Sequence, residues 1–209
     1  LRPGAILEAT RLVFTDRLAV GYTLASTALF GGLMAYIASI QQIVADAFHQ
    51  PTRVPLVFAA CAAPMAGAAF ANSRIVGRFG LRQVGHAGLA AFLLVSAIHW
   101  GAAQSGSESL FLFVTLQGLA MIAFAFCSSN FSTLAMTNME AIAGTASSVL
   151  GVTSSVGGAL IGLTIGQAFN GTAVPFLMGM LLCGLGALTV VALTERGRLF
   201  EKLAIASQS

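Results

Sequence analysis

The stretch that decides the fold class runs from Met139 to Gly166 and reads MEAIAGTASSVLG (139–151) followed by VTSSVGGALIGLTIG (152–166). Glu140 is its only charged residue, and the next charged residue along the chain is Glu195. An α-helix needs about 20 apolar residues to cross the roughly 30 Å hydrocarbon core of a bilayer. This stretch is long and apolar enough, so we predict a transmembrane helix over Ile142–Phe169.

Small residues recur along this stretch at spacings of three and four, which places them on one face of a helix. Each glycine lowers the stability of a helix by about 1 kcal/mol relative to alanine. A face of small residues must therefore serve a purpose that offsets this loss. Such a stripe lets a second helix approach closely and slide, which suits a moving transporter or a rigid membrane bundle. We interpret it as a helix-packing face made of Gly144, Ser148, Gly151, Ser155, Gly158, Gly162 and Gly166.

The overall composition places the whole chain in a membrane. Of its 209 residues, 57% are hydrophobic and only 8% are charged, against roughly 25% charged in an ordinary soluble domain. A soluble protein with so few charges could not cover its surface, so lipid must be its solvent. No basic arm or charge block suggests a nucleic-acid partner. The three cysteines, which lie in apolar runs without CxxC spacing, are Cys61, Cys127 and Cys183. We interpret them as core residues, and a disulfide or a metal site is the alternative.

Six stretches are long and apolar enough to span a bilayer. They cover Leu18–Ile43, Pro55–Ala71, Val84–Ala103, Leu110–Phe131, Ile142–Phe169 and Val174–Leu193. The predicted fold class is an all-α membrane protein with six transmembrane helices over residues 18–194. Residues 195–209 form a cytoplasmic tail, and residues 1–17 form a cytoplasmic linker or an interfacial amphipathic helix. For residues 5–18, an inward extension of the first span is the alternative.

The basic residues predict how the chain lies in the membrane. Only Arg53 falls in a link on one side of the spans. Cytoplasmic loops carry an excess of Lys and Arg, so the opposite side is predicted to be cytoplasmic, with both termini there. The other nine of the ten basic residues lie on that side: Arg2, Arg11, Arg17, Arg74, Arg78, Arg82, Arg196, Arg198 and Lys202.

The sequence contains little that could carry out catalysis. No span has an Asp, Glu, Lys or Arg in its middle, although such residues usually mark ion pathways and proton relays. Ser147 and Ser148 lack an oriented base, because His99 belongs to the opposite face and His86 has no visible orienting partner. No HExxH sequence or Walker A loop is present. We predict no enzyme activity, no metal site and no cofactor. His99 is interpreted as a membrane-boundary residue, with a proton carrier as the alternative.

Four stretches together resemble a known family. They are GYTLASTALFGGLMAYIAS (Gly21–Ser39), NSRIVGRFGLRQV (Asn72–Val84), SSNFSTLAM (Ser128–Met136) and AGTASSVLG (Ala143–Gly151). The chain resembles the second six-helix half of a major facilitator superfamily transporter, in its bicyclomycin and chloramphenicol resistance branch of drug:proton antiporters. The second stretch looks like the family's cytoplasmic loop signature, which implies a cytoplasmic gate at Arg74, Gly77, Arg78, Gly80 and Arg82.

The resemblance implies twelve helices in two halves around a central cavity. Its activity would be multidrug efflux by proton antiport with alternating access, driven by the proton gradient, in a bacterial inner membrane. The small-residue stripe would then pack and slide on the opposite half. Spans one, two, four and five would face a cavity for small apolar or cationic drugs, and the candidate cavity residues are Tyr22, Ser26, Phe30, Met34, Tyr36, Gln117, Met121, Phe124 and Ser128.

A six-helix chain of this kind needs a partner. The resemblance implies either a missing N-terminal six-helix half or a second copy of this chain. The rival interpretations are a homodimerising half-transporter and a non-transporting membrane subunit with a regulatory or structural role.

Overall fold

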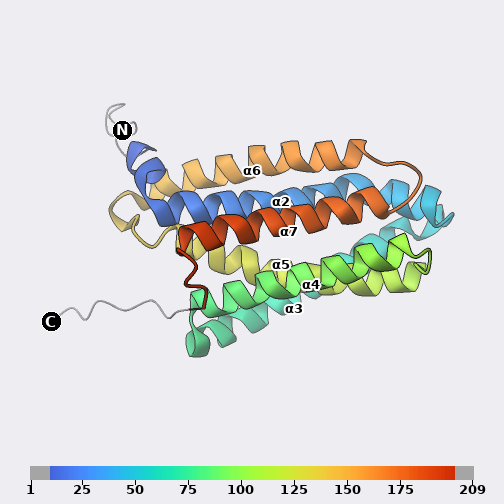
Figure 1. Ribbon diagram of the computed structural model, residues 1–209, viewed down its shortest axis with the longest axis horizontal. Coiled ribbons are helices and arrows are strands. Elements are labelled where there is room, and N and C mark those ends of the chain that lie inside the picture. Colours follow the sequence, from blue (N-terminus) through green and yellow to red (C-terminus); the bar gives the residue numbers. More distant parts are fainter. Residues whose placement is uncertain (1–9, 201–209) are drawn as a thin grey trace.

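The computed structural model describes residues 10–200, and within this range the regular structure is entirely helical (Figure 1). Six of the helices are long and apolar enough to cross a membrane, so the predicted all-α membrane fold is confirmed. Short π and 3-10 turns continue α2 and precede α3 and α6. The six helices are α2 (Arg17–Gln42), α3 (Val54–Phe79), α4 (Leu81–Gln104), α5 (Leu110–Ala135), α6 (Ala143–Gln167) and α7 (Val174–Thr194).

A short helix over residues 10–15 precedes the first span and is separate from it. The break falls at Asp16, whose backbone is extended (φ −80°, ψ 121°) and whose carboxylate accepts a hydrogen bond from the Ala19 N–H at 2.7 Å. This is the capping that starts a helix. Over the described residues, the segment is therefore not an inward extension of α2. The remainder of the predicted linker and tail lies outside the described residues.

The connection between α3 and α4 is shorter than the sequence suggested. We expected a polar link from Asn72, but α3 continues to Phe79 and the chain turns only at Gly80, where φ is 90°. Asn72 is buried instead of solvated, because its side-chain amide donates to Ser129 Oγ at 3.2 Å and accepts from Asn130 Nδ2 at 2.8 Å. These bonds across to α5 hold the last turns of α3 in the bundle.

The six helices form two groups of three (Figure 1). In one group, α2 packs against α6 and α7, and in the other, α5 packs against α3 and α4. The groups meet where α2 packs on α5 and where α4 packs on α7. The three cysteines are free and buried in this packing, which confirms their interpretation as core residues.

This pairing has an internal symmetry. The symmetry appears when α2 is exchanged with α5, α3 with α6, and α4 with α7. The α2–α6 pair then becomes the α5–α3 pair, and the α2–α7 pair becomes the α5–α4 pair. The α2–α5 and α4–α7 pairs map onto themselves. Because successive spans alternate in direction, α2 and α5 cross the bundle in opposite senses. The packing is therefore that of two three-helix units that run through the bundle in opposite orientations, an inverted repeat.

The small-residue stripe of α6 is divided between two environments. A Cβ added at Gly158 would lie 2.6 Å from Phe30 Cδ1, and one at Gly162 would lie 2.8 Å from the Ala35 backbone nitrogen. At Gly144 and Gly151, an added Cβ would meet no atom within 4 Å. The expectation that the whole stripe packs on an opposite half is therefore wrong for its second part, which packs on α2 within this bundle.

Candidate functional site

A polar pocket lies between α5 and α6, against α2, in the half of the bundle that carries the basic residues. Its volume is about 220 Å³. Seven of its lining residues carry a hydroxyl and none is charged. We call it the serine pocket, and it is lined by Thr23, Ser26, Phe30, Ser128, Ser132, Ala135, Met136, Ser147, Leu150, Gly151, Ser154 and Ser155.

The hydroxyls of the serine pocket differ in what they already bind. Thr23 donates to the Ala19 carbonyl at 2.6 Å, and Ser147 donates to the Gly144 carbonyl at 3.1 Å. The Oγ of Ser26 is buried and has no hydrogen-bond partner among the described residues. A buried hydroxyl without a partner costs free energy, which a ligand or a bound water would recover. Ser26 is therefore the group through which this pocket is best suited to bind a polar atom.

Three of the nine candidate cavity residues line this pocket, namely Ser26, Phe30 and Ser128. Tyr36 lies elsewhere, because its hydroxyl donates to the Phe58 carbonyl of α3 at 2.9 Å and its ring stacks on Phe58 at 5.5 Å. Met34 lies against Gly162 in the α2–α6 contact. The remaining four are buried inside the bundle away from the pocket: Tyr22, Gln117, Met121 and Phe124.

Tyr22 belongs to a buried group of polar residues that joins α2, α4 and the end of α7. We call it the inner polar cluster, and it consists of Tyr22, His86, Glu195 and Arg82. Its hydroxyl donates to Glu195 Oε1 at 2.5 Å and lies 3.0 Å from His86 Nε2. His86 Nδ1 accepts the Phe200 N–H at 3.1 Å, which leaves Nε2 to donate to Tyr22 when the ring is neutral. The result is a directed chain of hydrogen bonds from His86 through Tyr22 to Glu195.

Arg82 completes the inner polar cluster, since its Nε lies 3.1 Å from Glu195 Oε1. Arg74 and Arg78 are instead exposed at the same end, over the rings of Phe70 and Phe79 at 4.5 and 5.6 Å. Gly77 is exposed on α3, and Gly80 forms the turn.

Sequence reasoning missed Glu195, which it assigned to the cytoplasmic tail over residues 195–209. Glu195 follows α7 directly and is only 7% exposed. The available signal was that the chain's first acid after Glu140 comes directly after an apolar span and is followed by arginines at 196 and 198. Such an acid can fold back against the basic turn between α3 and α4.

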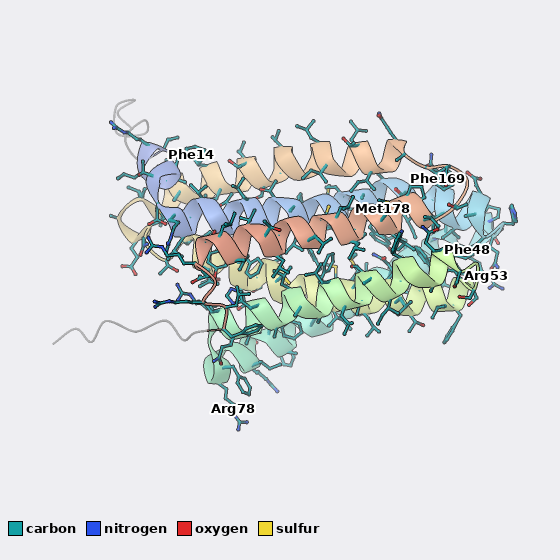
Figure 2. The ribbon with its side chains drawn as sticks, in the orientation of Figure 1. Phe14, Phe48, Arg53, Arg78, Phe169 and Met178 are labelled. Atoms are coloured by element: carbon teal, nitrogen blue, oxygen red, sulfur yellow. The ribbon has the colours of Figure 1, made fainter. Side chains whose placement is uncertain are left out.

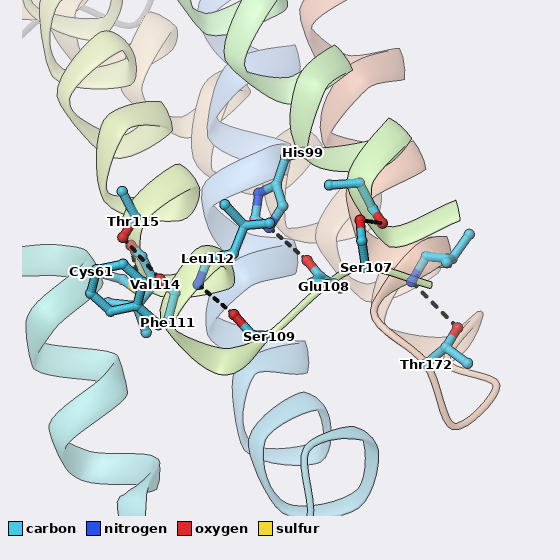
Figure 3. A network of polar contacts seen from close by, with 12 residues as sticks. Cys61, His99, Ser107, Glu108, Ser109, Phe111, Leu112, Val114, Thr115 and Thr172 are labelled. Carbon is cyan, nitrogen blue, oxygen red and sulfur yellow. Dashed lines mark hydrogen bonds and ion pairs between the residues drawn. The ribbon is translucent and has the colours of Figure 1, made fainter. Parts of the chain in front are cut away.

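A second buried pair lies at the opposite end of α4 (Figure 3). His99 Nε2 lies 2.8 Å from Glu108 Oε1, and their side chains are 1% and 9% exposed. The imidazole packs edge-on against Phe113, with ring centroids 5.1 Å apart. The interpretation of His99 as a boundary residue gave its place along the helix but not its burial or its acidic partner.

No family model, no curated protein and no solved structure matches this chain. The geometry defines an integral membrane protein with a neutral, hydroxyl-lined pocket between three of its spans.

Proposed function

We propose that this chain is one six-helix half of a secondary transporter that works by alternating access. The observation that carries the proposal is the inverted pairing of α2, α3 and α4 with α5, α6 and α7. Many secondary transporters are built from inverted repeats, with the substrate bound near the interface of the repeats. The serine pocket fits such a site, because it is formed by α2 from one unit and by α5 and α6 from the other.

The open face of α6 supports a second half that covers the serine pocket. Gly151, Ser147 and Ser155 line the pocket and are all exposed. On the outer side of the same helix, Val156 and Leu160 are 57% and 61% exposed. Lipid can cover the valine and the leucine, but the Ser155 hydroxyl, which has no hydrogen-bond partner among the described residues, is better satisfied by another protein surface or by a water-filled cavity. A second six-helix body over α6 would provide both.

Multidrug efflux by proton antiport is the particular activity that the family resemblance implies, and we propose it for the complete assembly. The serine pocket is neutral and contains one aromatic ring, that of Phe30, which suits apolar or weakly cationic compounds. It holds no carboxylate, so the acid that couples transport to protons would come from the other half. The excess of basic residues at one end supports a cytoplasmic location for that end.

The test is dye efflux by the complete protein in cells or proteoliposomes with an imposed proton gradient. Gly151→Leu adds a large side chain at the lining of the serine pocket, and we expect it to abolish efflux while membrane insertion continues. Gly186→Leu is the matched control, because Gly186 is exposed on α7 with no atom within 4 Å of an added Cβ. Equal efflux by the two variants would overturn the assignment of the pocket as the substrate site.

The alternative for the assembly is a homodimer of this chain, and the unpartnered face of α6 favours it equally. In a homodimer, two copies of α6 would face each other across a two-fold axis. Cysteines introduced in turn at Val152 and Val156 would then cross-link copies of the same chain. If the chain forms a homodimer that exports no dye, the remaining interpretation is that it is a non-transporting membrane subunit.

A further inference from the structure

An apolar groove on the other side of the bundle has no role in the proposed transport function. Helices α3 and α4 both pack on α5 but hardly touch each other, so a hollow of about 660 Å³ remains between them. Each of the three helices contributes to its walls, including Ile75 and Phe79, Ala87 and Ala91, and Ile122 and Phe126. We call this hollow the α3–α4 groove.

The dimensions of the α3–α4 groove match one leaflet of a bilayer. Along α4 its lining extends from Gln83 to Val95, which corresponds to about 18 Å at 1.5 Å per residue. Half of the roughly 30 Å hydrocarbon core is about 15 Å. Gln83, at the end of α4 that carries the basic residues, is the only polar side chain of the lining. An acyl chain that reaches from the interface to the bilayer centre would fit this shape and polarity.

Two arginines stand at the polar end of the α3–α4 groove. The Arg78 guanidinium lies 5.6 Å from the ring centroid of Phe79, which is itself a wall of the groove. Arg74 lies one turn earlier on α3. Within residues 10–200, neither arginine has a carboxylate at ion-pair distance, whereas Arg82 is already paired with Glu195. The polar end of the groove therefore lies beside two exposed cations, stacked on Phe70 and Phe79, that have no carboxylate partner among the described residues.

We propose that the α3–α4 groove is a binding site for an anionic phospholipid, with one acyl chain in the groove and the phosphate at Arg78 and Arg74. The positive charge of the two arginines at the polar end of the groove favours an anionic headgroup, because juxtamembrane Lys and Arg residues attract anionic lipids. Helices α3 and α4 lie on the side of the bundle away from α6 (Figure 1), so a second half covering α6 leaves the groove between them open to the bilayer. This site would hold a lipid whether or not the protein transports drugs.

The test is native mass spectrometry of the detergent-purified full chain, titrated with phosphatidylglycerol or phosphatidylcholine of identical acyl chains. Each arginine near the membrane surface is worth about a fivefold change in lipid affinity, so two give a preference of roughly 25-fold for phosphatidylglycerol. Arg74→Gln with Arg78→Gln should abolish this preference. Arg53→Gln removes the same charge at the opposite end of the bundle (Figure 2) and should change nothing.

A second pair of variants tests the groove itself. Ala91→Phe places a ring in the groove and should lower the retention of both lipids, whereas Ala97→Phe modifies an exposed position of α4 outside the groove. Equal retention of the two lipids by the unmodified protein would overturn the proposal, as would an equal loss in the Arg53 control. Retention of neither lipid would also overturn it and would indicate that a protein segment fills the groove.

Discussion

The divided stripe of α6 gives a quantitative prediction from two glycines on the same helix. At Gly162, an added Cβ would lie 2.8 Å from both the Ala35 nitrogen and the Met34 carbonyl carbon, which are backbone atoms that no side-chain rotation can move. At Gly151, an added Cβ meets no atom within 4 Å. We therefore compare Gly162→Ala with Gly151→Ala.

Both substitutions gain the same helix propensity, about 1 kcal/mol per glycine replaced, so this term cancels in the difference. What remains is the cost of overpacking at Gly162, which is typically about 1–3 kcal/mol. Because the clash is with backbone, α2 and α6 must separate, and we expect the upper part of that range. Gly151→Ala alone should be neutral or stabilising by up to about 1 kcal/mol.

The assay is reversible unfolding in mixed micelles, followed by helical circular dichroism, with the free energy of unfolding compared between the two variants. Equal stabilities would refute the close α2–α6 packing on which the fold description rests. A Gly151→Ala variant less stable than Gly162→Ala would show that the open and packed parts of the stripe have been assigned the wrong way round.

Three further predictions concern the buried polar groups and the cysteines. Tyr22→Phe removes the hydroxyl between His86 and Glu195 and should cost about 1–3 kcal/mol of unfolding free energy, since a buried acceptor loses its donor; an unchanged stability would contradict the inner polar cluster. A double-mutant cycle on His99→Gln and Glu108→Gln should give a coupling energy of about 0.5–3 kcal/mol, and strict additivity would contradict a contact at 2.8 Å. The three native cysteines are buried, so N-ethylmaleimide should label them only after unfolding, and rapid labelling of the folded protein would contradict their place in the core.

The spans could be predicted from the sequence because hydropathy and length decide them. The observed helices agree with the predicted spans within a few residues, apart from the end of α3. There the segment from Asn72 to Phe79 reads as a polar link, but the contacts of Asn72 with α5 bury its polar side chain and keep the segment helical. That contact joins residues far apart in the chain, which a local pattern does not reveal.

The candidate cavity was only partly predicted, for a geometric reason. Residues four apart on a helix are separated by 400°, so a row such as Tyr22, Ser26 and Phe30 turns by about 40° at each step. Tyr22 and Phe30 therefore differ by about 80°, and Tyr22 faces α4 and α7 while Phe30 faces α6. The bond from Tyr22 to Glu195 spans 173 positions of the chain, which no spacing rule anticipates.

The measurement that most directly tests the two-half account is the mass of the polypeptide and of its assembly, both extracted from the native membrane. We predict twelve helices around the serine pocket. This corresponds to a mass near twice 21.4 kDa, either in one covalent chain or in a stable dimer. A monomer of 21.4 kDa with no further helices would contradict it, because the open face of α6 and the serine pocket would then have no second half to cover them.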